Sequence, residues 1–108
     1  MSEIGAVLDR LMTNIEGRRR ADPESSYTAS LLAAGPERCA RKFGEEAIEA
    51  TLAGALQHKA ELTAEAADVM YHLAVLLAAN GLSFEDVARE LAAREGVSGH
   101  DEKAGRQK

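Results

Sequence analysis

Apolar residues recur at helical spacing along most of the chain, three and four positions apart, so that they fall on one face of each helix. The first such stretch covers residues 3–20 and contains Ile4, Val7, Leu8, Leu11, Met12 and Ile15. Further helices are expected from Ser25 or Ser26 to Ala34, from Pro36 to Gln57, from the residue after Glu61 to about Asn80, and from Ser83 to about Arg94. The pattern predicts an all-α fold, a bundle of four to five helices.

Helix-breaking and helix-capping residues mark the boundaries between these segments. Asp22-Pro23 ends the first helix, and Ser25 or Ser26 can cap the second. Gly35 followed by Pro36 is the usual order of one helix end and the next helix start. The segment His58–Glu61 reads as a connection, Gly81 as a stop, and Ser83 with Asp86 as a variant capping box.

Two of the expected helices have faces that must be covered. The third should bury Cys39, Phe43, Ala47, Ile48, Leu52 and Leu56. Between Ala66 and Ala79 only Asp68, Tyr71 and His72 are polar, and a helix that is apolar nearly all round is normally surrounded. One small domain cannot cover it on every side, so we expect a second copy of the helix to do so, in a homodimer.

Length and charge narrow the class of protein. The 108 residues fit one domain, expected over residues 1–96, and the polar residues 97–108 lack a packing pattern and read as a tail. A net charge of −5 argues against nucleic acid as the main partner. No signal peptide is evident, and the longest apolar run, Leu73–Ala79, is too short to span a bilayer. We expect a cytoplasmic protein that binds neither membrane nor nucleic acid.

Five carboxylates form the candidate site. Glu45, Glu46 and Glu49 lie on the third expected helix, and Glu65 and Asp68 on the fourth. At about 100° per residue, acids three or four positions apart share a face, so two antiparallel helices can aim them at one point. Crowded like charges imply a cation, and hard oxygen ligands suit magnesium, calcium or manganese.

A structural explanation competes with this one. The acids of the third helix could form a solvated face, with Arg41 paired to Glu45 and Lys42 to Glu46. The second acidic pair favours a site, because an aspartate in a helix as apolar as that of Asp68 is seldom buried without a partner. His72, one turn further on, is expected to be a hydrogen-bonded core or interface histidine.

Basic and hydroxyl residues admit two interpretations as well. Arg18, Arg19 and Arg20 either suit the negative end of the first helix or contact phosphate. In Ser26-Tyr27-Thr28 one hydroxyl can cap and Tyr27 can pack. A carboxylate di-iron site would use Glu-x-x-His pairs, which the chain lacks, so the bases near the acids favour magnesium-assisted phosphate chemistry.

The ordered set of motifs resembles the all-α nucleoside triphosphate pyrophosphohydrolases, the MazG-like group, and within it the phosphoribosyl-ATP pyrophosphatase family. The resemblance covers roughly residues 4–96. It rests on Asp22-Pro23, Ser26-Tyr27-Thr28, Gly35, Lys42-x-Gly44-Glu45-Glu46-x-x-Glu49, Glu65-Ala66-Ala67-Asp68-x-x-Tyr71-His72 and Gly81-Leu82-Ser83. It implies hydrolysis of 1-(5-phosphoribosyl)-ATP to 1-(5-phosphoribosyl)-AMP and pyrophosphate, the second step of histidine biosynthesis.

The resemblance also implies roles for single residues. Glu46, Glu49, Glu65 and Asp68 would hold Mg²⁺, and Glu45 would complete the shell or accept the proton of the attacking water. The candidates for substrate contacts are Arg18, Ser26, Tyr27, Thr28, Lys42 and Lys59. The family often has a lysine where this chain has Ala55, and Lys59 would replace it.

Two alternatives stay open from the sequence. One is a house-cleaning enzyme that hydrolyses free nucleoside or deoxynucleoside triphosphates at the same metal site. The other is a helical dimerisation module without catalytic activity, which would tolerate loss of the carboxylates and show no magnesium dependence.

Overall fold

The computed structural model describes residues 2–96, which form five α-helices and no strand. The helices are α1 (Ile4–Gly17), α2 (Tyr27–Ala34), α3 (Pro36–Ala55), α4 (Lys59–Ala79) and α5 (Phe84–Ala93). The predicted all-α class and helix number are confirmed. The tail predicted at 97–108 lies outside the described residues.

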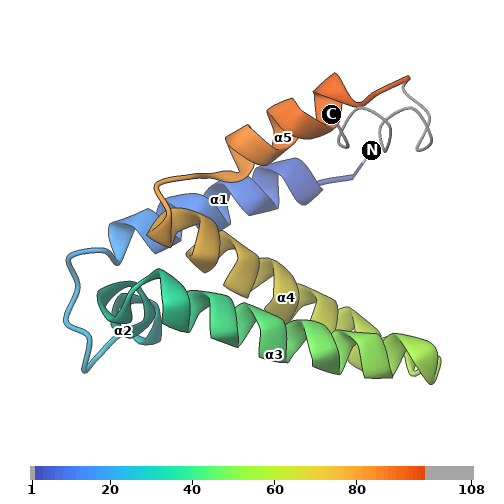
Figure 1. The fold of residues 1–108 in the computed structure, drawn as a ribbon, viewed down its shortest axis with the longest axis horizontal. Helices are drawn as coiled ribbons and strands as arrows, with labels where there is room; N and C mark the ends of the chain where they lie inside the picture. Colours follow the sequence, from blue (N-terminus) through green and yellow to red (C-terminus); the bar gives the residue numbers. More distant parts are fainter. Residues whose placement is uncertain (1, 97–108) are drawn as a thin grey trace.

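The long helices α3 and α4 form an antiparallel hairpin, and the shorter helices gather at one end of it (Figure 1). Helix α2 packs on both members of the hairpin, while α1 crosses α4 and α5 runs beside α1. The largest fully buried side chains are Ile15, Leu31, Cys39 and Val75. The core therefore lies where α1, α2 and the start of α3 meet the second half of α4.

Local sequence signals set most helix starts as predicted. The Ser26 hydroxyl accepts a hydrogen bond from the Ala29 amide at 3.1 Å and caps α2. Gly35, at φ 98°, joins α2 to α3, which begins with Pro36. Ser83 and Asp86 form a capping box at the start of α5. These three boundaries are confirmed.

The connection between α3 and α4 differs from the prediction. Helix α4 begins at Lys59, so the segment His58–Glu61 is mostly helix rather than loop. The reason is that the His58 carbonyl accepts a hydrogen bond from the Leu62 amide at 2.8 Å, so helical hydrogen bonding begins at His58. Gln57 turns the chain with φ 60°, the only positive φ outside glycine among residues 2–96.

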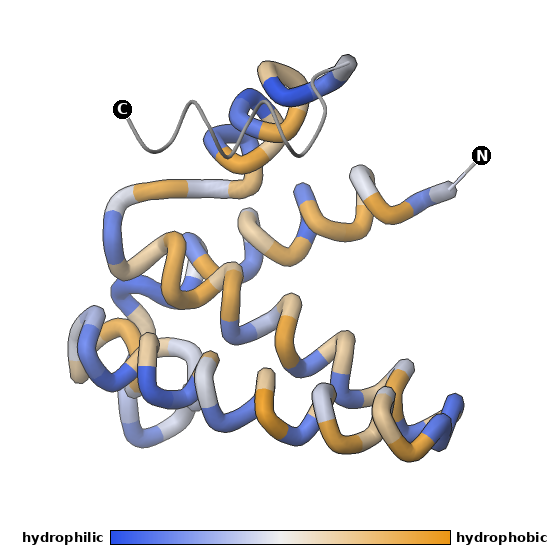
Figure 2. Tube along the Cα trace, turned by 45° about the vertical axis from the view of Figure 1, so that its right-hand side comes forward, coloured by the Kyte–Doolittle hydropathy of each residue, from blue (hydrophilic) through white to orange (hydrophobic). Residues whose placement is uncertain are grey.

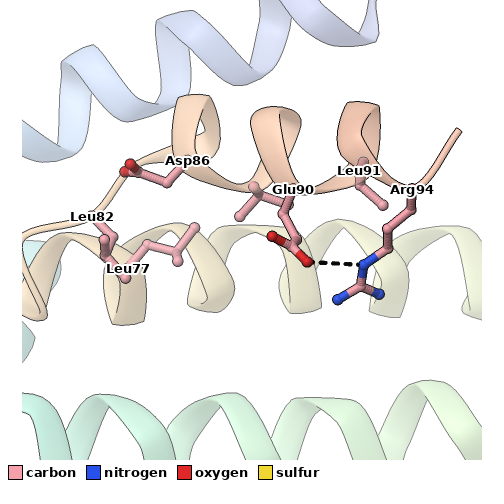
Figure 3. A pocket seen from close by; sticks show the side chains of 7 residues that line it. Leu77, Leu82, Asp86, Glu90, Leu91 and Arg94 are labelled. Atoms are coloured by element: carbon pink, nitrogen blue, oxygen red, sulfur yellow. Dashed lines mark hydrogen bonds and ion pairs between the residues drawn. The ribbon is translucent and has the colours of Figure 1, made fainter. Parts of the chain in front are cut away.

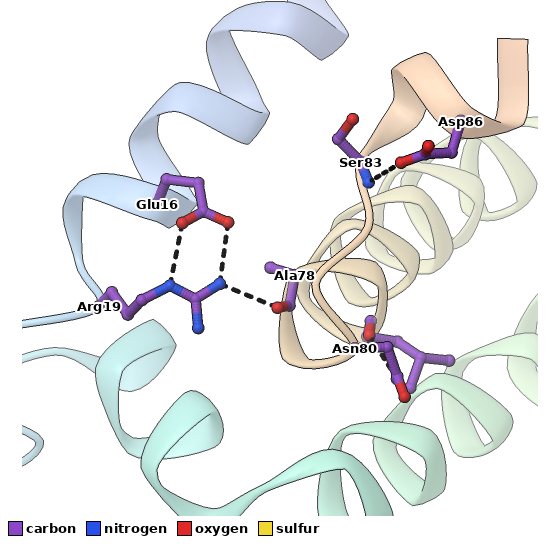
Figure 4. A network of polar contacts seen from close by, with 7 residues as sticks. Glu16, Arg19, Ala78, Asn80, Ser83 and Asp86 are labelled. Carbon is purple, nitrogen blue, oxygen red and sulfur yellow. Dashed lines mark hydrogen bonds and ion pairs between the residues drawn. The ribbon is translucent and has the colours of Figure 1, made fainter.

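Arg19 has a role that the sequence did not indicate. Helix α1 ends at Gly17, so the arginines lie beyond it. The Arg19 guanidinium pairs with both Glu16 oxygens at 2.9 Å and donates to the Ala78 carbonyl at 2.8 Å (Figure 4). Arg19 thus ties α1 to the negative end of α4 instead of capping its own helix.

The predicted buried side of α3 is largely wrong for the single chain. Cys39 and Ala53 are buried, but Ile48, Leu52 and Leu56 remain exposed. The cause is that α1, α2 and α5 cover only one end of the hairpin, while apolar segments continue to its far end (Figures 1 and 2). Helix α4 is long and apolar enough to cross a membrane, but the core helix of a soluble protein can have the same length and composition.

Candidate active site and metal centre

Three carboxylates meet in the exposed half of the hairpin. Glu46 and Glu49 come from adjacent turns of α3, and Glu65 comes from α4 opposite them. One oxygen of each lies within 4.8 Å of the other two. The antiparallel packing of α3 on α4 produces this convergence, as the three-residue spacing on facing helices suggested.

The carboxylates are electrostatically crowded. Partial burial raises the pKa of Glu46 and of Glu65, and hydrogen bonding to Glu49 and the neighbouring negative charges raise each pKa further. One oxygen of Glu65, Oε2, is buried and has no hydrogen-bond partner among residues 2–96. Such a group has several negatively charged oxygens and too little positive charge nearby. A divalent cation bound to these oxygens would balance the charge.

Asp68 lies beside this group but is not one of the three. Its side chain is exposed, contrary to the expectation of burial, because no residue among 2–96 covers that face of α4. Its negative charge still contributes to the raised pKa of Glu46 and of Glu65. Asp68 is therefore close enough to the group to affect its electrostatics.

Glu45 and Lys42 pair with each other. The Lys42 ammonium lies 3.0 Å from Glu45 Oε2, which lowers the pKa of Glu45 and raises that of Lys42. The predicted pairs of Arg41 with Glu45 and of Lys42 with Glu46 do not form, and Arg41 instead contacts Glu37 at 3.5 Å. Glu45 thus stands outside the group of three carboxylates.

The three residues of the Ser26-Tyr27-Thr28 block have different roles in the structure. Ser26 is occupied by the cap of α2, while Thr28 Oγ1 hydrogen-bonds the Tyr71 hydroxyl on α4. Tyr27 leaves 53% of its surface exposed. Tyr71 was absent from the predicted site residues. Its position three residues after Asp68, on the same face of the helix, was the signal that could have found it.

His72 is a core histidine, as predicted, but it is not hydrogen-bonded as expected. Its side chain is buried and Nδ1 has no hydrogen-bond partner among residues 2–96. Burial lowers its pKa, and the positive charge of Lys42 lowers it further. The imidazole is therefore held neutral.

Two predicted substrate contacts lie at the ends of helices. Arg18 follows the end of α1 and Lys59 is the first residue of α4. Both side chains are exposed and make no hydrogen bond or ion pair within residues 2–96. Lys59 precedes Glu65 by six residues, which is about 9 Å along a helix axis.

The site is suited to a hard divalent cation. Its donors are carboxylate oxygens from two helices, and the group contains neither cysteine nor histidine. Oxygen donors of this kind favour magnesium, calcium or manganese over zinc.

Comparison with known proteins identifies the family. The family model described as phosphoribosyl-ATP pyrophosphohydrolase matches residues 8–95. The chain belongs to this family. The resemblance inferred from the ordered motifs is thereby confirmed.

Relatives in the phosphoribosyl-ATP pyrophosphohydrolase family match nearly end to end. The chain is similar to proteins named phosphoribosyl-ATP pyrophosphatase from Cereibacter sphaeroides (strain ATCC 17025), 55% identical over 94% of this chain and 98% of the relative. It is similar to those from Dinoroseobacter shibae, 55% identical over 94% and 99% of the two chains, and Rhodobacter capsulatus, 56% identical over 92% and 96%. All of the candidate site residues fall within the matched range.

Proposed function

We propose that this chain hydrolyses 1-(5-phosphoribosyl)-ATP between the α and β phosphorus atoms, releasing 1-(5-phosphoribosyl)-AMP and pyrophosphate in histidine biosynthesis. The family match over residues 8–95 and the names of the relatives support the reaction. The observation that carries the chemistry is the convergence of Glu46, Glu49 and Glu65 within 4.8 Å.

The residues present fit a magnesium site. Glu46, Glu49 and Glu65 would hold Mg²⁺, with Asp68 as the fourth carboxylate. The orphaned Oε2 of Glu65 and the raised pKa of Glu46 both point to missing positive charge. When bound, Mg²⁺ would neutralise phosphate oxygens and stabilise the leaving pyrophosphate.

The side chains around the group have separate tasks. Lys42, one turn before Glu46 on α3, would attract the phosphate chain, and Arg18 and Lys59 are the remaining candidates for substrate contacts. Ser26 acts through the cap of α2, which holds Tyr27 and Thr28 in place. The proton of the attacking water needs a carboxylate that is not fully engaged.

Two residues compete for that proton. Glu45 was the candidate from the sequence, but pairing with Lys42 lowers its pKa and makes it a weaker base. Glu46 lies inside the group, where its pKa is raised in the metal-free protein, but it would be engaged by Mg²⁺ when the metal is bound. Comparing turnover of Glu45→Gln and Glu46→Gln between about pH 6 and about pH 9 separates them, because loss of the base removes the acidic limb of the profile.

The proposed reaction is tested by pyrophosphate release from phosphoribosyl-ATP by the wild type and by Asp68→Asn, with helical content followed by circular dichroism. We expect turnover to be lost while the helices persist. Wild-type turnover in the folded variant would remove Asp68 from the site. Preference for free nucleotides in the same assay would support the house-cleaning alternative, and no activity on any substrate would support the dimerisation module.

We infer that the chain forms a homodimer. Helix α5 has no buried residue, and it borders two apolar grooves of about 320 and 390 Å³. Leu77, Leu82, Val87 and Leu91 line the first, between α4 and α5 (Figure 3). A second copy would cover these grooves and the exposed apolar residues of α3. Cytoplasmic location, and the lack of nucleic-acid or membrane partners, stay predictions.

A further inference from the structure

Three aromatic rings form a compact set where α2 meets α4. The rings of Tyr27 and Tyr71 are stacked, with centroids 6.5 Å apart and planes 20° from parallel. The ring of His72 is nearly perpendicular to both, with its centroid 6.1 Å from that of Tyr27 and 5.0 Å from that of Tyr71. These are geometries that aromatic pairs prefer, so the three side chains fix one another's orientation.

The set is anchored on its inner side and open on its outer side. Thr28 hydrogen-bonds the Tyr71 hydroxyl, and His72 is only 6% exposed. Tyr27, in contrast, is 53% exposed. A flat aromatic ring that is held from behind and free in front is a surface on which a second flat ring can stack.

The set also adjoins the carboxylates. Tyr71 follows Glu65 by six residues on α4, about 9 Å along the helix axis. Tyr27 is close enough to Lys42 to influence its pKa, and Lys42 precedes Glu46 by one turn. The base of a nucleotide whose phosphates lie at the carboxylates can therefore reach Tyr27.

Building on the proposed function, we propose that the ring of Tyr27 is the stacking surface for the purine base of the substrate, supported from behind by Tyr71 and His72. In this substrate, 1-(5-phosphoribosyl)-ATP, the phosphoribosyl group is attached to N1 of the adenine. Substitution at N1 makes adenine a stronger base, so the ring carries positive charge near neutral pH. A cationic ring is attracted to the face of a phenol more strongly than a neutral one.

Enzyme kinetics on phosphoribosyl-ATP can distinguish a role of the Tyr27 ring from a role of the Tyr27 hydroxyl. In Tyr27→Leu, which removes the ring, we expect KM to rise about tenfold with kcat changed by less than about twofold. Tyr27→Phe, the matched control, keeps the ring and should change KM by less than about twofold. Equal effects in both variants, or no effect in either, would overturn the proposal. Circular dichroism confirms that both are folded.

Binding of a nucleoside without phosphates gives a readout that does not depend on turnover. The chain has two tyrosines, two phenylalanines and no tryptophan, so its aromatic proton spectrum is sparse and Tyr27→Phe assigns the Tyr27 signals. We expect 1-methyladenosine to shift these signals, and adenosine to do so less strongly. Unshifted Tyr27 signals at saturating 1-methyladenosine would overturn the proposal.

The two failures can be told apart. If the wild type releases no pyrophosphate from phosphoribosyl-ATP while 1-methyladenosine still shifts Tyr27, the proposed function fails and the stacking surface stands. If turnover is normal and KM is insensitive to loss of the ring, the function stands and the stacking surface fails.

Discussion

At the scale of single residues, Glu49 is the centre of the carboxylate group. One of its oxygens lies within 4.8 Å of both Glu46 and Glu65, and hydrogen bonding to Glu49 contributes to the raised pKa of each. Such an arrangement is unfavourable without a cation, because like charges at short distance repel. The same residue therefore lowers the stability of the metal-free protein and makes the site able to hold metal.

Glu49→Gln should separate these two effects. Removing its charge relieves the repulsion, so we expect a higher Tm than wild type in a chelator. Adding Mg²⁺ should raise the Tm of the wild type but not that of the variant. Differential scanning calorimetry measures both values. A lower metal-free Tm, together with an intact magnesium shift, would contradict the role given to Glu49.

His72 should make stability depend on pH. Because its pKa is lowered in the folded state, the unfolded chain begins to bind a proton near about pH 6.5, at a higher pH than the folded chain does. Its contribution to stability therefore falls as pH drops through that value. We expect the Tm of His72→Phe to fall less than that of the wild type between about pH 7 and about pH 5.5. Parallel pH curves would show that His72 is not held neutral.

At the scale of elements, α3 and α4 end in the same hydrogen-bonded motif but with different residues at its left-handed position. After α3, His58 donates to the Ala53 carbonyl and Gln57 to that of Gly54. After α4, Leu82 and Gly81 make the equivalent bonds. Gln57 has φ 60° and Gly81 has φ 72°. Only glycine adopts this conformation without steric cost.

Gln57→Gly should stabilise the protein by about 1 kcal/mol, and Gly81→Ala should destabilise it by about as much. A β-carbon on Gly81 would meet no atom within 4 Å, so the cost in that control is conformational. Thermal unfolding should move by about 4–8 °C in opposite directions. A loss of stability in Gln57→Gly would mean that the glutamine side chain makes contacts that outweigh its strain.

The helices were predicted from the sequence more accurately than the contacts that their side chains make. Periodicity and caps placed all five helices, since these signals are local, and the Ser83–Asp86 box formed as predicted. Facing three-residue spacings also predicted the convergence of Glu46, Glu49 and Glu65. Residue spacing does not decide which of two nearby acids a side chain pairs with, so the pairing of Lys42 with Glu45, three residues on, escaped prediction. So did Arg19, whose partner lies 59 residues away.

At the scale of the whole molecule, several large apolar side chains are exposed in the described part of the chain. Ile48, Leu52 and Leu56 are exposed at one end of the hairpin, and Leu91 is exposed on α5. The expectation that these α3 residues are buried becomes correct only if another surface covers them. The exposed carboxylate Asp68 lies on the same uncovered half of the hairpin.

Charge placed in the groove beside α5 should therefore disrupt assembly. We expect wild type to sediment as a dimer and Leu91→Glu as a monomer, because burying an unpaired carboxylate is costly. Glu24→Gln, in the exposed loop before α2, is the control and should stay dimeric. A monomeric wild type at micromolar concentration would contradict the inferred dimer.

The most direct test of the account is pyrophosphate release by the wild-type protein from phosphoribosyl-ATP, beside ATP and the deoxynucleoside triphosphates, in Mg²⁺ and then in a chelator. We expect release from phosphoribosyl-ATP alone, lost on chelation and restored by Mg²⁺. Release that persists in the chelator would contradict the metal site. Release mainly from a free nucleotide would contradict the proposed substrate.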